Sequence, residues 1–399
     1  MTATYLLLTT VVFSMALKAC AARKLAVAGP INTFGLKLLS HSPPGENVMI
    51  SPYSICTAVA MLNAGAAGTT KAQIDKAFGW GDIDRLSGQY RKLLSSVGSS
   101  GEFNLSSSNR LYVDKEFHPL QSYTNTLSGD FGADLERVDF SSGDNSDTVQ
   151  QVNSWVESQT NGKIDKMFKE IDPQTRAILI NTIYFNAQWQ IPFTKTVKRA
   201  FYTDESHHTM VDTMTVSAVF GYYRSEDVEV VKLPYLAGKS DISMIIIKPA
   251  ARGGLAALEK KIIKKRFSKI NKWIKKVNEV YSYTIALSMP KFEFGSKFDN
   301  LKEILKENFG VKDVFNVGKA DLSGIDGSRN LFVSSVIHQS FISVDEKRTE
   351  AAAATSVQVR FRSGPRRVNI DHPFMFLIYD QKNKVVLFLG RMYTPGNAE

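Results

Sequence analysis

The spacing of apolar residues divides the chain into a helical first third and a strand-rich remainder. Apolar residues recur three or four positions apart over residues 26–39, 54–65 and 70–78, which predicts three amphipathic helices. A continuous β-branched run at residues 177–185 predicts a strand buried on both faces. Further strands are predicted at residues 228–233, 243–248, 281–289, 331–344, 374–379 and 384–389. Helices gathered early and strands later indicate an α+β fold.

Composition narrows the class of protein without identifying a function. The 399 residues are 43% hydrophobic and 22% charged, as in folded globular proteins, and length alone allows two or three domains. The formal net charge of +10 predicts attraction to polyanions but does not say which polyanion. The stretches rich in serine and glycine at residues 95–101 and 141–146 are typical of surface loops rather than of domain linkers.

The N-terminus has the pattern of a secretory signal peptide at residues 1–21. An apolar run over residues 5–17 precedes Ala19-Cys20-Ala21, a small-x-small cleavage pattern. The run is about 13 residues long, and a membrane anchor would need roughly 20. We therefore expect a secreted, extracellular protein whose mature chain comprises residues 22–399.

Two further residues bear on the extracellular environment. Loss of Cys20 with the signal leaves Cys56 without a partner, so we expect no disulfide within the mature chain. Cys56 stands in an apolar run and is predicted to be a buried structural thiol. The sequon Asn104-Leu105-Ser106 makes Asn104 a candidate glycosylation site, and the protein a candidate glycoprotein.

Searches for catalytic and metal-binding motifs fail. The six histidines show no HExxH or comparable spacing, and His207 and His208 are interpreted as a surface pair. No GxSxG elbow, GxxxxGK[ST] loop or GxGxxG after a strand occurs. We predict a protein that is not an enzyme and has neither metal nor cofactor. A Ser/His/Asp triad built from distant positions remains an alternative, because such triads are recognised by geometry.

One long segment has features of both a strand and an exposed loop. Roughly thirty residues separate the strands that end at Val344 and begin at Phe374, and connections of that length are usually functional or disordered. Over residues 349–359, small or uncharged residues alternate with polar ones, as in a strand with one buried face. An alanine helix over residues 350–355 is the alternative. The end at residues 360–365 has the composition of a cleavable loop, so two states are implied.

This combination resembles the reactive-centre loop of the serpins, which a protease cleaves and which then inserts into the main sheet. Six further segments match the family in order: residues 47–55 (NVMISPYSI), 180–193 (INTIYF with Trp189 and a following Pro-Phe), 233–235 (LPY), 289–292 (MPKF), 371–374 (DHPF) and 388–391 (FLGR). The resemblance implies one serpin domain over residues 22–399, with about nine helices around three β-sheets.

The resemblance also assigns roles to particular residues. It places the reactive-centre loop at about residues 346–365. Ser51, Asn181 and His338 would form the polar shutter cluster beneath the opening sheet, unless they are three independently satisfied core groups. Trp189 would lie at the breach of that sheet. The hinge would comprise Glu346, Arg348, Thr349, Glu350, Ala351, Ala352, Ala353 and Ala354.

The family's usual seventeen-residue register, counted from Glu346, places the reactive bond at Arg362-Ser363, with Arg360 as the alternative reactive residue. Arginine at the cut suits a protease whose specificity pocket carries a carboxylate. The resemblance therefore implies an arginine-specific, trypsin-like partner: trypsin, a kallikrein-like or plasmin-like enzyme, or a clotting protease. Phe361 favours the first three over thrombin.

The implied activity is suicide inhibition, in which the acylated protease is carried along as the loop inserts. Inhibitory serpins usually have glycine where this chain has Arg348, and arginine lacks the backbone freedom of glycine. The alternation places Arg348 on the solvent side, so we predict inhibition. The alternative is a non-inhibitory serpin that acts as a binding or carrier protein.

A basic segment with no acidic residue extends over residues 260–276. Apolar residues three or four apart predict a helix docked on the body, with its lysines in water. A solvated face is the ordinary meaning of such a run, but this density favours heparin or heparan sulfate, acting as an accelerator. Otherwise we expect a monomer with no nucleic acid or membrane partner. The chain also has a general likeness to serpins of blood-feeding arthropods, which act on host haemostasis. The predicted glycosaminoglycan-binding residues are Lys260, Lys261, Lys264, Lys265, Arg266, Lys269, Lys272, Lys275 and Lys276.

Overall fold

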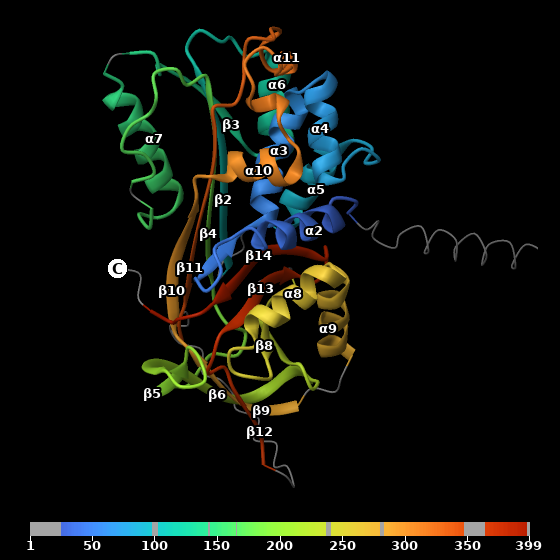
Figure 1. Cartoon of the computed structure of the whole chain (residues 1–399), viewed down its shortest axis with the longest axis vertical. Helices are drawn as coiled ribbons and strands as arrows, with labels where there is room; N and C mark the ends of the chain where they lie inside the picture. The colour runs from blue at the N-terminus through green and yellow to red at the C-terminus, as the bar shows by residue number, and fades with distance from the viewer. Residues whose placement is uncertain are drawn as a thin grey trace, which may run out of the picture.

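A tall central sheet forms the frame of the molecule, with helices around its upper part and a second group of strands across its lower end (Figure 1). The computed structural model describes residues 25–97, 103–142, 144–164, 166–236, 241–279, 283–346 and 364–396. The central sheet has five strands in the order β10 (Phe292–Phe298), β11 (Ser335–Val344), β4 (Ala177–Ala187), β2 (Phe103–Asp114) and β3 (Asp134–Val138).

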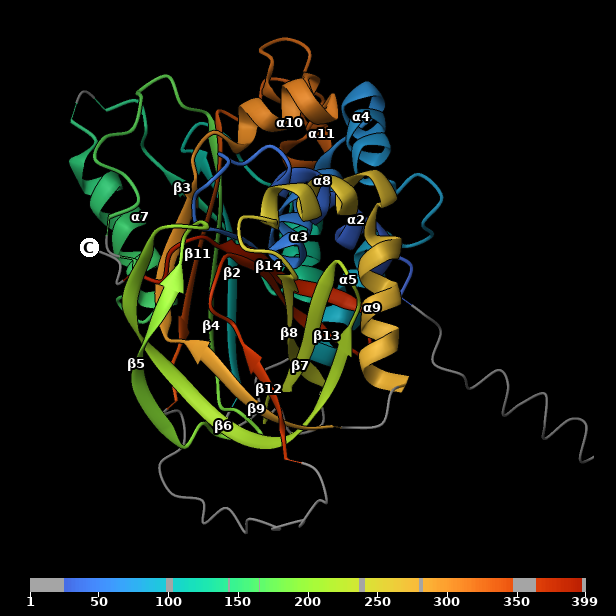
Figure 2. The same cartoon turned by 60° about the horizontal axis from the view of Figure 1, so that its bottom comes forward.

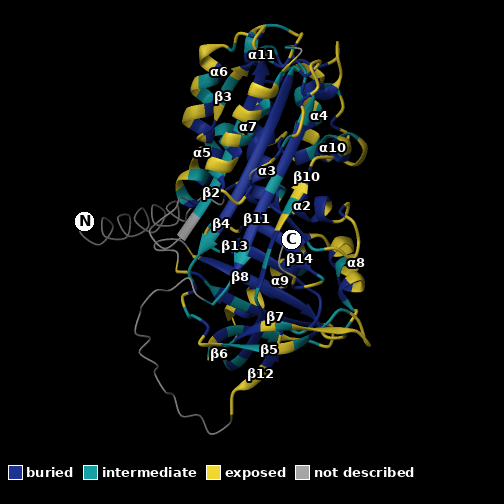
Figure 3. Cartoon of the chain, turned by 90° about the vertical axis from the view of Figure 1, so that its left-hand side faces the viewer, coloured by how far each residue is buried: buried dark blue, intermediate teal, exposed yellow. Residues whose placement is uncertain are grey.

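Helices cover both faces of the central sheet, which explains why β4 has a continuous apolar sequence. The helix α7 (Ser146–Gln159) packs Val152 and Val156 against Ile178 and Ile180 on one face. The helix α3 (Pro52–Gly65) lies behind the other face, and its side chains are buried almost throughout. Figure 3 shows β4 and β11 as largely buried strands in the middle of the molecule.

The remaining strands form two sheets that share one long strand, β6 (His208–Arg224). Residues 208–220 of β6 pair with β5 (Lys195–Tyr202) and β9 (Tyr283–Pro290), and β9 also pairs with β12 (Arg366–Asn369). Residues 221–224 pair with β7 and so continue into the other sheet. That sheet has the order β7 (Val228–Pro234), β8 (Ile242–Pro249), β13 (Phe374–Asp380), β14 (Val385–Met392) and β1 (Val48–Ile50).

The other helices pack around these sheets. Around the upper part lie α2 (Ala28–Leu39), α4 (Gly68–Phe78), α5 (Leu86–Val97), α6 (Gln121–Thr126), the π-helical turn η1 (Leu127–Phe131), α10 (Leu301–Phe309), the 3-10 turn η2 (Asp313–Phe315) and α11 (Ser323–Asp326). Beside the lower strands lie α8 (Leu255–Lys265) and α9 (Phe267–Glu279). The α+β class with three sheets is confirmed, and the described chain holds ten α-helices where we predicted about nine helices.

Two sequence predictions are wrong in detail. The strand predicted from residue 331 begins at Ser335, because Leu331 and Val333 are buried in an unpaired segment whose Val333 N–H bonds to the Val314 carbonyl at 2.9 Å. The basic segment forms two helices instead of one. Arg266 has a positive φ of 53° with a ψ of −166°, a conformation that non-glycine residues rarely adopt, and it ends α8. Ile263, one of the apolar residues at helical spacing that we expected to dock on the body, is 41% exposed, whereas Trp273 is buried.

Candidate functional site

The pairing of β4 with β11 forms a parallel seam in the centre of the molecule. Eight register pairs extend from Ile178 opposite Ser335 to Phe185 opposite Ile342, with no strand between them. A parallel pair has slanted hydrogen bonds and is slightly less stable per residue than an antiparallel pair. Parting these two strands would admit one further strand, so we call this pair the seam.

The three predicted shutter residues meet at this seam. Asn181 of β4 and His338 of β11 are register partners, and the His338 Nδ1 to Asn181 Oδ1 distance is 2.5 Å. The backbone N–H of Ser51 donates to His338 Nε2 at 3.1 Å. The Ser51 hydroxyl donates to the Leu387 carbonyl at 2.6 Å and also accepts from the Ser54 N–H, which caps α3. All three residues are buried, so the polar cluster joins the seam to the start of α3.

Sequence reasoning missed two members of this cluster. The Asn181 Nδ2 group donates to Asn109 Oδ1 of β2 at 2.5 Å and to the hydroxyl of Ser54. Asn109 is the register partner of Asn181, so Asn109, Asn181 and His338 form one row across three strands. Ser54 stands three residues after the cap at Ser51, a spacing that the sequence does display.

The hydrogen bonds around His338 define its protonation state. Burial lowers the pKa of His338 from 6.5 to about 3. Nε2 accepts the Ser51 N–H, so Nδ1 must carry the single proton and donate it to Asn181. A second proton on Nε2 would point at the Ser51 N–H, so two donors would face each other. His338 is therefore a neutral imidazole with one tautomer.

This protonation state predicts that the protein loses stability as the pH falls. The unfolded chain, with an ordinary histidine pKa, binds more protons than the folded chain between pH 6.5 and about 3. The free energy of unfolding should therefore decrease as the pH falls through this window, by up to about 1.4 kcal/mol per pH unit from His338. Denaturant unfolding between about pH 7 and pH 5 measures the slope, because few carboxylates titrate there.

The matched comparison for this prediction is His338→Gln, which removes the titrating group. The variant should be less stable at neutral pH but should show a flatter dependence on pH. The pKa of His41 is also lowered, by burial and by Lys37. His41 is present in both proteins, so the difference between their slopes isolates His338. Equal slopes would contradict this assignment.

The predicted breach residue Trp189 lies at the end of the seam that faces the lower strands in Figure 1, where β11 ends. Its indole Nε1–H donates to the Asp345 carbonyl at 3.0 Å, and its ring stacks on Tyr235 with centroids 4.4 Å apart. Glu346, the first predicted hinge residue, forms an ion pair with Lys291 at 2.9 Å. These contacts fix the position at which the chain leaves the central sheet.

The two described ends of the predicted loop belong to different sheets. The chain leaves β11 at Glu346, and it re-enters as β12 at the edge of the sheet that contains β9. The guanidinium of Arg366 lies 5.3 Å from the ring centroid of Tyr222 and 5.4 Å from that of Tyr283. Outside the described residues lie Arg348, Thr349, Glu350, Ala351, Ala352, Ala353, Ala354, Arg360, Arg362 and Ser363, and also the predicted signal peptide 1–21.

The predicted glycosaminoglycan-binding residues lie on α8, on α9 and at the turn between them (Figure 2). Eight of the nine are exposed and Lys269 is half-buried. Lys261 pairs with Asp227, and Lys275 pairs with Glu279 at 3.3 Å. Within the described part of the chain, the other basic side chains of this set have no acidic partner within 4.0 Å. The surface formed by these nine residues is therefore strongly positive, and it is divided between two helices with different axes.

Other predicted features are also placed by the structure. Cys56 is fully buried and its thiol pKa is raised by burial, which confirms a structural thiol. Asn104 belongs to β2 opposite Asn186, and its side chain lies outside the description. His207 is an exposed partner of Asp204 at 2.7 Å. Among the described residues, no group of three metal-binding side chains occurs, and no helix has the length and apolar character needed to cross a membrane.

Comparison with known proteins gives matches along nearly the whole chain. The family model described as serpin (serine protease inhibitor) matches residues 31–395. The leukocyte elastase inhibitor of Equus caballus is 34% identical over 372 residues, which cover 90% of this chain and 96% of that protein. Iripin-2 of Ixodes ricinus is 35% identical over 378 residues, covering 90% and 91%. The structure of Serpin48 from the insect Tenebrio molitor matches with a TM-score of 0.79 at 30% identity, covering 94% of this chain and 100% of that one.

Proposed function

The chain belongs to the serpin family of serine protease inhibitors, and we propose that it is a secreted suicide inhibitor of arginine-specific, trypsin-like proteases. In this proposal the protease serine attacks the carbonyl carbon of Arg362 and the Arg362-Ser363 peptide bond breaks. Ser363 becomes a new amino terminus, and Arg362 stays esterified to the protease. The freed segment then enters the seam faster than the ester is hydrolysed. The inhibitor is consumed and does not turn over.

The observation that carries this proposal is the closed seam, which ends where the loop begins. Among the described residues the central sheet has five strands, and the chain leaves β11 at Glu346, next to the end of the seam that faces the lower strands. A strand that enters between β4 and β11 would gain two hydrogen-bonded neighbours, and this gain would supply the energy to move the protease. The alternating residues 349–359 supply a suitable strand.

The choice of protease rests on the sequence of the loop. The guanidinium of Arg362 would pair with the carboxylate in the specificity pocket of a trypsin-like protease. A loop without a basic residue at this position would leave that carboxylate unpaired. Relatives of this chain include inhibitors named for leukocyte elastase, so the choice of protease proposed here rests on the loop sequence and not on those relatives. We extend the proposal to trypsin, kallikrein-like, plasmin-like or clotting enzymes, and hence to haemostasis.

Mixing the protein with trypsin tests the proposal. A complex of inhibitor and trypsin that survives SDS denaturation is expected, because the ester bond is covalent. Clean cleavage at the loop without a complex would instead support the alternative, a non-inhibitory serpin acting as a binding or carrier protein. Arg348, in place of the usual glycine at the hinge, is the residue that favours this alternative.

We also propose that the basic face of α8 and α9 binds heparin or heparan sulfate. Retention on a heparin column should weaken as salt rises, because salt screens the exposed lysines. Replacing Lys264, Lys265 and Lys272 with glutamate should abolish that retention. The matched control replaces three exposed lysines elsewhere, Lys169, Lys312 and Lys319, with the same change in charge. Equal loss of retention in both variants would show a response to net charge and would refute a local site.

A further inference from the structure

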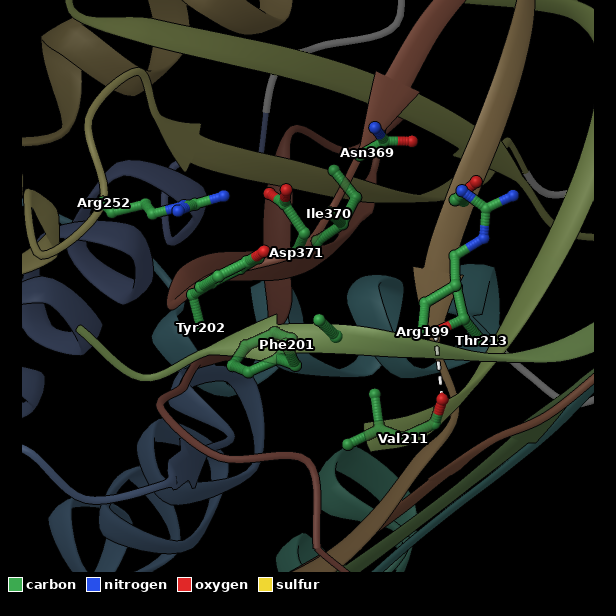
Figure 4. A pocket seen from close by; sticks show the side chains of 11 residues that line it. Arg199, Phe201, Tyr202, Val211, Thr213, Arg252, Asn369, Ile370 and Asp371 are labelled. Atoms are coloured by element: carbon green, nitrogen blue, oxygen red, sulfur yellow. Dashed lines mark hydrogen bonds between the residues drawn. The ribbon is translucent and has the colours of Figure 1, made fainter. Parts of the chain in front are cut away.

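A pocket of about 280 Å³ lies where the end of β5, the residues after β12 and the connection from β8 to α8 meet (Figure 4). It is separate from the seam, and neither the predicted loop nor the basic face of α8 and α9 contributes to it. Phe201, Val211 and Ile370 give it apolar walls, while Thr213 and Asn369 supply hydrogen-bonding groups. Its two strongest polar groups are arginines from segments far apart in the sequence, Arg199 and Arg252.

Arg199 projects from β5 on the face of the sheet that holds the pocket. It is the register partner of Val211, which also lines the pocket. The adjacent Lys198 has the opposite parity and pairs with Asp212 at 3.0 Å. Arg199 itself has no carboxylate within 4.0 Å in the described chain. Its charge is thus available to a ligand.

Arg252 reaches the pocket from the other side. Its guanidinium carbon lies 3.3 Å from the ring centroid of Tyr202, a cation–π contact that limits the motion of the side chain. The described residues place no carboxylate within 4.0 Å of this side chain either. A planar guanidinium held in this way is prepared to bind a carboxylate through two parallel hydrogen bonds.

One carboxylate does line the pocket, that of Asp371, but it has partners of its own. His372 Nδ1 lies 2.8 Å from its Oδ1, and Lys248 Nζ lies 3.9 Å from the same atom. Burial raises the pKa of Asp371, but the hydrogen bond from His372 and the charge of Lys248 outweigh this effect and lower it overall. Lys248 lies closer to Glu229, at 2.8 Å, and is shared between the two carboxylates. The pocket lining still holds two arginines against the single carboxylate of Asp371, which leaves an excess of positive charge.

We propose that this pocket binds a small organic dicarboxylate, with one carboxylate on Arg199, the other on Arg252 and the carbon chain along the apolar wall. Two separated guanidiniums can each bind one carboxylate, so a dicarboxylate fits the pocket better than a monocarboxylate. The apolar side chains favour an organic ligand over a hydrated inorganic anion. The inference does not depend on protease inhibition.

Occupancy would hold together three segments that few main-chain hydrogen bonds now connect. Tyr202 N donates to the Asp371 carbonyl at 2.8 Å, and Ile370 N donates to the Ser288 carbonyl at 2.8 Å. Within the part of the chain that the structure describes, the strand β12 has four paired residues and lies at the edge of its sheet. A ligand bridging Arg199 and Arg252 across the end of β12 would therefore reduce the opening of this strand.

Titration calorimetry with malonate, succinate, glutarate and adipate, and with acetate as the monoacid, tests the proposal. One spacer length should bind at least about tenfold more tightly than acetate, because only a matched spacing engages both arginines. Hydrogen exchange with that dicarboxylate present should slow at the amides of residues 366–371. Dicarboxylates that all bind no better than acetate would overturn the proposal.

The variants Arg199→Gln and Arg252→Gln should each reduce binding of the preferred dicarboxylate to the level of acetate. The matched control is Lys198→Gln, which removes the same charge from the neighbouring position on the opposite face, and it should bind as the parent does. Equal weakening in the control would overturn the proposal in favour of general charge attraction. Unfolding curves recorded without ligand identify any variant that fails to fold. If Arg199→Gln fails to fold, Arg199→Lys takes its place, because lysine keeps the charge but lacks the bidentate geometry of arginine.

Discussion

Arg362→Ala is expected to lower the rate constant for inhibition of trypsin by about 10⁴-fold. Trypsin-like enzymes carry a buried carboxylate in the pocket that receives the residue before the cut. Alanine leaves that carboxylate unpaired and desolvated in the encounter complex, which is why the expected loss is large. The loss of trypsin activity with time, at several inhibitor concentrations, gives the rate constant, and the SDS-resistant band should disappear.

Arg360→Ala is the control for this prediction. It removes the same charge two residues earlier and should leave the rate constant close to that of the parent. An elastase, whose pocket accepts small side chains, should still form a complex with Arg362→Ala, which would show that the loop remains accessible and able to insert. A large loss for Arg360→Ala with little effect of Arg362→Ala would instead assign the reactive bond to Arg360.

Asn181→Leu is expected to decrease the free energy of unfolding by about 3 kcal/mol. Leucine has a similar shape, so the change leaves little cavity but removes the acceptor of the His338 Nδ1–H and the donor to Asn109. The His338 Nδ1–H and the Asn109 Oδ1 belong to buried residues and would each lose their hydrogen-bond partner. Denaturant unfolding at constant pH measures the difference.

The neighbouring residue in β4 supplies a matched control. Thr182 is also buried, but its hydroxyl has no hydrogen-bond partner in the described structure. Thr182→Val, which replaces that hydroxyl with a methyl group, should therefore leave stability unchanged or increase it. A loss of stability as large as that of Asn181→Leu would show that β4 tolerates no substitution here. It would contradict the claim that the hydrogen bonds among Asn109, Asn181 and His338 account for the effect of Asn181→Leu.

Most of the fold is readable from the sequence wherever burial is continuous or strictly periodic. The strand at residues 177–185 and the helix at residues 54–65 were predictable because each has one uninterrupted apolar signal. The strand β2 was not, because Ser106 and Ser108 use their hydroxyls to bond Gln159 of α7. A serine-rich strand satisfied by a helix elsewhere in the chain has no local signature.

The candidate site shows the same limit. Resemblance to serpins was sufficient to name Asn181, His338 and Ser51, but Asn109 joins them only through the register of β2 against β4. The break of the basic segment at Arg266 depends on a single residue with positive φ, and arginine carries no signal for that conformation. Pairing registers and single backbone reversals are set by tertiary packing, so helical or strand periodicity does not reveal them.

The loop connects two sheets, because the chain leaves the central sheet at Glu346 and returns at Arg366 beside β9. Under the proposed function, a cut between these residues gives each sheet its own free end, and no covalent link then draws an inserted strand out again. Each molecule that has reacted once would thus carry the inserted loop irreversibly, as a sixth strand of the central sheet. Since added strand pairing raises the melting temperature, a melting curve of a mixed sample would count spent and unspent molecules separately.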